Sequence, residues 1–120
     1  MQATWIEEIE AIKKFLERWR GATVSPSAYT SGHGVLILGL FNAPKAPGKL
    51  AYIQCKDCQV IQFYRTHIEN SDLGISVEQH RLGKVHTITE PGRLHIVCYS
   101  VFVTEVEKRI NFHKEFDLSS

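Results

Sequence analysis

The sequence predicts a single α+β domain over residues 1–120, in which an amphipathic N-terminal helix packs on a five- or six-stranded, mainly antiparallel sheet. Up to Gly21 the apolar residues recur with helical spacing, whereas beyond it they form short runs separated by Gly, Pro and Asn. A chain of this length fits one domain of ordinary size. The pattern leaves open whether the sheet closes partly into a barrel and whether a short helix follows it.

The N-terminal segment has the pattern of a capped amphipathic helix. Thr4 and Glu7 have the spacing of a capping box, and Gly21 is typical of the position just beyond a helix end. An apolar stripe at spacings of three and four is formed by Trp5, Ile9, Ile12, Phe15, Leu16 and Trp19. We expect this stripe to pack on the sheet, with a partner-binding face anchored by Trp5 and Trp19 as the alternative.

Three segments follow before the middle of the chain. Residues 22–34 are rich in Ser, Thr, Gly and Pro and are predicted to form a surface loop. Residues 35–41 are apolar at both alternating sets of positions, which is typical of a strand covered on both faces. Residues 42–49 contain two prolines and a glycine and indicate a loop or a wide turn.

A β-hairpin is predicted around Lys56 and Asp57. The flanking segments 50–55 and 58–64 are rich in residues that favour strands, and the gap between them is short. Apolar residues at helical spacing in 58–68 make a helix the alternative for the second segment.

Alternation of apolar and polar residues predicts a half-buried strand over 75–80, a tight turn at 82–83 and a second strand over 85–89. This turn would place Val77 opposite Ile88. The resulting register gives one polar face composed of Ser76, Glu78, His80, Thr87 and Thr89.

The longest strand candidate covers residues 93–103 and follows Pro91 and Gly92, which suit the central positions of a type II turn. Strict alternation would put Leu94, Ile96, Cys98 and Phe102 on one face, and His95, Val97, Tyr99, Val101 and Val103 on the other. Both faces are apolar, which indicates a central strand or a sheet that curls on itself.

Two structures are compatible with the segment after this strand. Thr104 and Glu107 repeat the capping-box spacing, which predicts a short helix. That helix would be lined by Val106, Ile110 and Phe112 or Phe116. A strand that continues to Val106 is the alternative.

The composition indicates a soluble globular protein without a strong global charge. Hydrophobic residues make up 43% of the chain and charged residues 22%, and 14 Lys and Arg balance 13 Asp and Glu. A signal-peptide pattern and an apolar run of membrane-spanning length are not seen in the sequence. Three cysteines, an odd number, argue against a secreted disulfide framework, so a cytoplasmic location is expected.

Cys55 and Cys58 form a C-x-x-C pair, a spacing found in zinc sites when a second pair of ligands converges on it. His95 and Cys98 are three residues apart and would face opposite sides of a strand. Redox chemistry of the thioredoxin kind needs the pair at a helix N-terminus, whereas strand-forming residues follow it here. The preferred interpretation is two small side chains at a hairpin end, with metal binding or redox activity as weaker alternatives.

Other polar groups are predicted to be structural. Ser76, Glu78 and His80 share one strand face, but neighbouring same-face side chains emerge about 6.6 Å apart and no G-x-S-x-G turn accompanies them. His33 lies between two glycines, where it could act as a general base, although loop flexibility explains the same residues. The sequence therefore predicts no catalytic residue and no cofactor.

A nucleic-acid interface would need exposed aromatic residues beside basic ones. The candidates are Tyr52, Phe63, Tyr64 and Arg65, near Lys49 and Lys56. The same stretch carries four cations, Lys45, Lys49, Lys56 and Arg65. Because four cations along one stretch are more often ordinary surface, a nucleic-acid partner is the weaker interpretation of this set.

The leading functional hypothesis is a small, non-enzymatic binding or adaptor protein that acts through protein–protein contacts, including self-association as a homodimer. One helix cannot cover both apolar faces of the strands at 35–41 and 93–103, so either the sheet closes or another subunit covers them. Two alternatives stay open: a hydrolase-like enzyme with a pocket lined by histidine and Cys98, and a nucleic-acid-binding module.

Overall fold

The computed structural model describes residues 4–30, 34–65 and 67–112. Within these ranges the chain forms one helix and six strands, which are α1 (Ile9–Arg18), β1 (Thr23–Thr30), β2 (Val35–Phe41), β3 (Leu50–Phe63), β4 (Gly74–His80), β5 (Gly83–Glu90) and β6 (Leu94–Val106). The strands form one antiparallel sheet in the order β1-β2-β3-β6-β5-β4. The predicted α+β arrangement of a helix and an antiparallel sheet is therefore confirmed.

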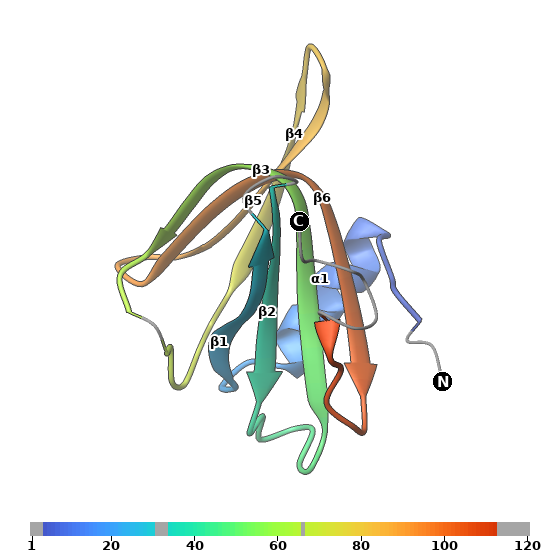
Figure 1. Ribbon diagram of the computed structural model, residues 1–120, viewed down its shortest axis with the longest axis vertical. Coiled ribbons are helices and arrows are strands. Elements are labelled where there is room, and N and C mark those ends of the chain that lie inside the picture. The colour runs from blue at the N-terminus through green and yellow to red at the C-terminus, as the bar shows by residue number, and fades with distance from the viewer. Residues whose placement is uncertain (1–3, 31–33, 66, 113–120) are drawn as a thin grey trace.

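The sheet is strongly bent but is not closed into a barrel, because β1 and β4 lie at opposite ends of the strand order among the described residues. In Figure 1, α1 lies behind the sheet and the chain after β6 turns back in front of β3. The β4–β5 hairpin projects beyond the rest of the molecule.

The helix begins later than the capping box of Thr4 and Glu7 predicts. Its N-cap is Glu8, whose carboxylate accepts hydrogen bonds from two backbone amides of the first turn. Ile6 is extended and exchanges hydrogen bonds of 2.8 and 2.9 Å with Val103. This pairing is available because β5 covers only the first half of β6. The predicted helix start is therefore wrong, since a free strand edge recruits the segment before the helix.

The predicted loop over 22–34 is wrong for most of its length, because residues 23–30 form β1. β1 lies at the sheet edge, where Pro26 costs no ladder hydrogen bond. Val24 exchanges two backbone hydrogen bonds with Ile68 on the outer side of β1. Residues 31–33 lie outside the described part. In contrast, β2 is covered on both faces and a loop follows it, as predicted.

The predicted hairpin at Lys56 and Asp57 is also wrong, because β3 is continuous from Leu50 to Phe63. Asp57 takes a left-handed conformation with φ of 55°, and the register with β6 shifts between Cys58 and Val60. β6 stays paired on both sides of this point, so the chain bends instead of reversing (Figure 1). Strand, not helix, is confirmed for the residues after Cys58.

β6 follows the same bend, and its alternation of faces switches at Tyr99 and Ser100. Cys98 on one side of the switch and Val101 and Val103 on the other all pack in the core next to α1. The prediction that Val101 and Val103 face away from Cys98 is therefore wrong, because strict alternation does not survive the bend.

The ends of β6 agree with one prediction and correct another. Gly92 precedes the strand with φ of 79°, as the predicted type II turn requires. The strand continues to Val106, so the alternative of a longer strand is confirmed and a helix starting at Thr104 is wrong. Phe116 lies outside the described residues.

Both strands of the β4–β5 hairpin are confirmed, with a different register. Val77 lies opposite His86 instead of Ile88, and the turn comprises residues 81–82. The difference is a slip of two residues, which leaves every side chain on its predicted face.

The sheet carries an apolar core on each face. Ile12 and Leu16 of α1, together with Trp19 at its C-cap, pack with inward side chains from the strands in one large buried cluster. On the opposite face, Ile37 and Phe112 belong to a smaller buried cluster against which Trp5 and Ile110 pack. The chain's own segments therefore cover both faces of β2. No helix in the described part of the chain combines the length and apolar character needed to cross a bilayer.

Candidate functional site

The structure separates the two predicted tryptophan anchors. Trp19 is 1% exposed in the core beside α1. Trp5 is half-buried and packs against Phe112, with ring centroids 6.4 Å apart, in the cluster on the opposite face. The two rings therefore do not form a common stripe on the surface.

The predicted nucleic-acid set is not brought together either. Tyr52 is 4% exposed and packs on the face away from α1, whereas Phe63 packs against the core beside α1. Lys49 and Arg65 are exposed, and Lys56 places its Nζ 4.9 Å from the Phe102 ring centroid. The two aromatic rings thus lie on opposite faces of the sheet, so the set does not form one continuous surface.

The three cysteines converge at the bend of the sheet. Cys55 and Cys98 are buried and Cys58 is partly exposed. Hydrogen bonding between the thiols, first with Cys98, together with burial raises the pKa of Cys58. The pKa of Cys98 is raised as well, chiefly by its hydrogen bond with Cys55. Within the described ranges, no group of three or more His, Cys, Asp or Glu side chains is placed to hold a metal ion.

The histidine beside the cysteines is His86, which lies opposite Cys98 across β5 and β6. Burial lowers the pKa of His86, and its Nδ1 is buried with no hydrogen-bond partner among the described residues. A raised thiol pKa next to a lowered imidazole pKa favours two neutral groups. The thiolate–imidazolium pair of a cysteine nucleophile needs the opposite shifts.

The remaining polar candidates lie on strands. Glu78 and His80 form an exposed pair with 3.2 Å between Oε2 and Nε2, at the far end of the β4–β5 hairpin. His95 is half-buried on β6, and His33 lies outside the described residues.

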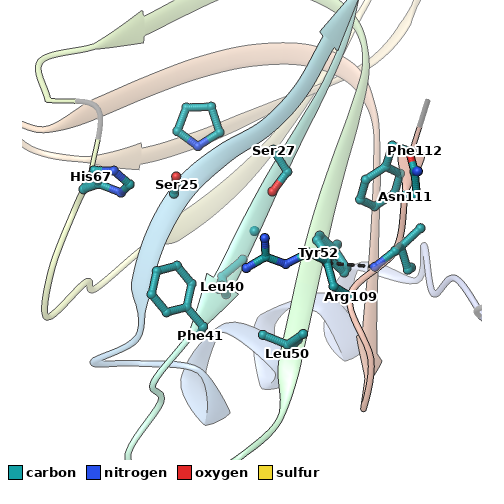
Figure 2. A pocket seen from close by; sticks show the side chains of 13 residues that line it. Ser25, Ser27, Leu40, Phe41, Leu50, Tyr52, His67, Arg109, Asn111 and Phe112 are labelled. Atoms are coloured by element: carbon teal, nitrogen blue, oxygen red, sulfur yellow. Dashed lines mark hydrogen bonds between the residues drawn. The ribbon is translucent and has the colours of Figure 1, made fainter. Parts of the chain in front are cut away.

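A groove with a volume of about 670 Å³ lies on the sheet face away from α1. We call it the β1–β3 groove. Its walls come from β1, β2, β3, the segment that follows β3 and the segment that follows β6 (Figure 2). The lining residues are Ser25, Pro26, Ser27, Gly39, Leu40, Phe41, Leu50, Tyr52, His67, Arg109, Ile110, Asn111 and Phe112.

A β-bulge shapes the floor of the β1–β3 groove. The register of β1 with β2 shifts between Pro26 and Ala28, so Ser27 is the additional residue. Its hydroxyl lies over Gly39, where a Cβ would come within 2.5 Å of the Ser27 Oγ and 3.6 Å of a Tyr52 ring carbon. Gly39 therefore makes room for the Ser27 hydroxyl inside the groove.

The segment after β6 forms one wall and is fastened to β3 by Tyr52. The Ile110 amide donates a 3.1 Å hydrogen bond to the Tyr52 hydroxyl (Figure 2). The Tyr52 ring meets Phe112 edge to face, with centroids 4.8 Å apart. This places two aromatic rings beside the polar floor.

Among the described lining residues of the groove there are two basic side chains, Arg109 and His67, and no acidic one. In Figure 2 the Arg109 guanidinium extends across the hollow, and His67 lies on its far side. His67 is placed there because the next residue, Ile68, pairs with Val24 at the outer edge of β1. Among the described residues, neither Arg109 nor His67 makes an ion pair or a side-chain hydrogen bond, so both are available to a ligand.

Of these groove residues, sequence reasoning had identified Tyr52 alone as a binding candidate. Two signals point to the others: a proline inside a β segment, which marks an edge or a bulge, and a glycine inside the apolar run of β2, which marks a close approach. Arg109 lines the groove only because the chain after β6 folds back over Tyr52. No sequence pattern near Arg109 predicts that path. The sequence matches no known family model, no curated protein and no solved structure.

Proposed function

We propose that the protein is a non-enzymatic binding protein and that the β1–β3 groove binds an organic anion with an apolar, ring-containing body. The observation that carries this proposal is the Arg109 guanidinium, which has no partner within the described part of the chain and extends over a hollow whose described lining residues include no carboxylate. A guanidinium presents a planar, positively charged set of donors that matches a carboxylate, sulfonate or phosphate.

The volume and the lining of the β1–β3 groove support the other part of the proposed ligand, its apolar, ring-containing body. A volume of about 670 Å³ is within the range of small-molecule sites. Phe41 offers half-exposed aromatic surface, and the largely buried rings of Tyr52 and Phe112 also line the hollow. The hydroxyls of Ser25 and Ser27 offer hydrogen bonds at the floor. A ligand with one charged group and one ring system would use both kinds of surface.

The same groups support binding without catalysis. Arg109 cannot serve as a general base, because a guanidinium does not lose its proton in a protein. His67 makes no hydrogen bond with Ser25 or Ser27 in the described part, so neither serine has an activating base.

The proposal is tested with two fluorescent probes of similar shape. Anilinonaphthalene sulfonate carries the anion, and N-phenylnaphthylamine lacks it. We expect Arg109→Gln to raise the Kd for the sulfonate about tenfold, the loss of one charge-assisted hydrogen-bonding group, and to leave binding of the neutral probe unchanged. The matched control is Arg81→Gln, in the exposed turn between β4 and β5. Equal sulfonate binding by the wild type and Arg109→Gln would contradict the proposal.

Protein–protein contact, including self-association, is a second candidate function. It is favoured by Leu82, which is 85% exposed at the tip of the projecting β4–β5 hairpin (Figure 1). Sedimentation at several concentrations measures self-association, and Leu82→Asp is expected to weaken it. A wild-type protein that stays monomeric at every concentration would remove the homodimer form of this candidate.

A further inference from the structure

We propose that Cys58 and Cys98 form a reversible intramolecular disulfide when the protein meets a disulfide oxidant such as oxidised glutathione. The two residues lie directly opposite each other on β3 and β6, at the bend of the sheet. Their side chains pack on the same face, next to the core beside α1, and both are free thiols.

The register of the pair suits a disulfide. The Cys58 amide donates a 2.9 Å hydrogen bond to the Gly34 carbonyl, so it points toward the start of β2 and away from β6. Opposed residues that do not exchange hydrogen bonds have Cα atoms about 4.5 Å apart. That separation is within the range of about 4.4–6.8 Å found for disulfides. The Cys58 thiol itself donates a 3.5 Å hydrogen bond to the Cys55 carbonyl, which keeps its sulfur on the side of β3 that borders the core.

A comparison of Cys55 with Cys58 indicates which thiol should pair with Cys98. Cys55 also interacts with Cys98, but its partner in the β3–β6 register is Val101. Cys55 and Cys98 are both 0% exposed, whereas Cys58 is partly exposed. An external oxidant therefore reaches Cys58 first, and Cys98 is the thiol directly across from it.

The chemistry is two successive thiol–disulfide exchanges. The Cys58 thiol loses its proton, and its sulfur attacks one sulfur of oxidised glutathione, which breaks the glutathione disulfide and releases one reduced glutathione. The Cys98 sulfur, after losing its proton, attacks the Cys58 sulfur of the mixed disulfide and releases the second glutathione. Two protein thiols are oxidised, and one glutathione disulfide is reduced to two thiols.

Hydrogen bonding and burial raise the pKa of both thiols, so few thiolates are present at neutral pH. The exchange should therefore be slow near neutrality and should accelerate with pH. The bond would join the two strands at their bend and fix the angle between the two parts of the sheet.

Tryptic mapping tests the assignment directly, because the sequence places each cysteine in its own peptide: 50–56, 57–65 and 94–108. Folded protein is incubated with oxidised glutathione at about pH 8.5, where more thiolate is present, and is then quenched with acid and alkylated. We expect peptides 57–65 and 94–108 to be joined, and dithiothreitol to separate them. Urea-unfolded protein, treated in the same way, is expected to give mixed pairings.

Two variants sharpen the result. Cys55→Ser should still form the link, because it removes the thiol outside the proposed pair. Cys98→Ser should stop at a glutathione adduct on Cys58. A wild-type protein that gives only the adduct, no reaction, or a link from peptide 50–56 would overturn the proposal. Circular dichroism establishes that each variant is folded, and Cys55→Ser provides the answer if Cys98→Ser does not fold.

Discussion

The indole nitrogen of Trp19 donates a 2.6 Å hydrogen bond to the Glu105 carboxylate, at the end of α1 and near the end of β6. The same Oε1 atom accepts a 2.7 Å hydrogen bond from the Arg18 Nε. One carboxylate thus joins the last turn of the helix to the central part of the sheet. Burial raises the pKa of Glu105, but the hydrogen bonds from Arg18 and Trp19 outweigh it and the net pKa is lowered.

Glu105→Gln should lower the free energy of unfolding by about 1 kcal/mol at neutral pH, since it weakens two hydrogen bonds to a charged acceptor that is partly exposed. The contribution of Glu105 is fully present above the unfolded-state pKa of about 4.5 and is lost as the pH falls through the lower pKa of the folded state. Urea denaturation at neutral and acidic pH measures both effects. The difference between wild type and variant should shrink in acid.

Glu107→Gln is the matched control, because Glu107 is an exposed carboxylate two residues further along. It should leave the free energy of unfolding nearly unchanged. A gap between wild type and Glu105→Gln that stays constant into acid would contradict the proposed role of the carboxylate charge.

The periodicity of the sequence predicted those elements in which buried residues recur at a regular, short spacing. The apolar run of β2 and the alternation in β4 and β5 each depend on the face that a strand presents, and slipping the hairpin register from Ile88 to His86 left those faces unchanged. The helix stripe was also informative, because Ile12 and Leu16 pack against the sheet.

The missed features depend on contacts between distant segments. Thr4 and Glu7 have the spacing of a capping box, yet Ile6 pairs with Val103, which is remote in sequence. Asp57 resembled a turn residue, but β6 runs past it on the other side and holds the strand together. The β1–β3 groove requires the chain after β6 to return over Tyr52, and no pattern near Arg109 predicts that return.

Gly39→Ala should close the floor of the β1–β3 groove. The new Cβ would lie 2.5 Å from the Ser27 hydroxyl, which must rotate away, while the next side-chain contact at 3.6 Å is ordinary. We expect a stability loss of up to about 1 kcal/mol, at the low end for an overpacked site, and weaker binding of anilinonaphthalene sulfonate. Probe titration and urea denaturation measure the two effects.

Two further variants separate the groove effect from general strain in a strand. Gly74→Ala also adds a methyl group to a strand glycine, but its nearest neighbour would be 3.9 Å away, so binding should not change. Adding Ser27→Ala to Gly39→Ala removes the clashing hydroxyl and should recover part of the lost stability. If the double variant is no more stable than Gly39→Ala, the contact with Ser27 is not the cause.

His86 should make the protein less stable as the pH falls below about 6.5. Burial lowers the pKa of this imidazole in the folded state from its ordinary value of 6.5, so the unfolded chain binds the proton first. Lowering the pH from that value toward the folded-state pKa therefore favours unfolding. Denaturant titrations from neutral to mildly acidic pH should show a weaker pH dependence of stability for His86→Gln than for wild type. Identical slopes for His86→Gln and wild type would contradict this assignment.

The Tyr52 hydroxyl should control how firmly the segment after β6 lies over the β1–β3 groove. Tyr52→Phe keeps the ring and its edge-to-face contact with Phe112 but removes the acceptor for the Ile110 amide. The free energy of unfolding should fall by about 1 kcal/mol, the usual net contribution of one hydrogen bond. Hydrogen exchange should show the Ile110 amide exchanging faster, while amides at the centre of β3 and β6 keep their protection. Tyr64→Phe is the control, since that exposed hydroxyl bonds to Gln62 and not to the segment after β6. If Ile110 exchange is unchanged in Tyr52→Phe, the segment is held by the packing of Phe112 and Trp5 instead.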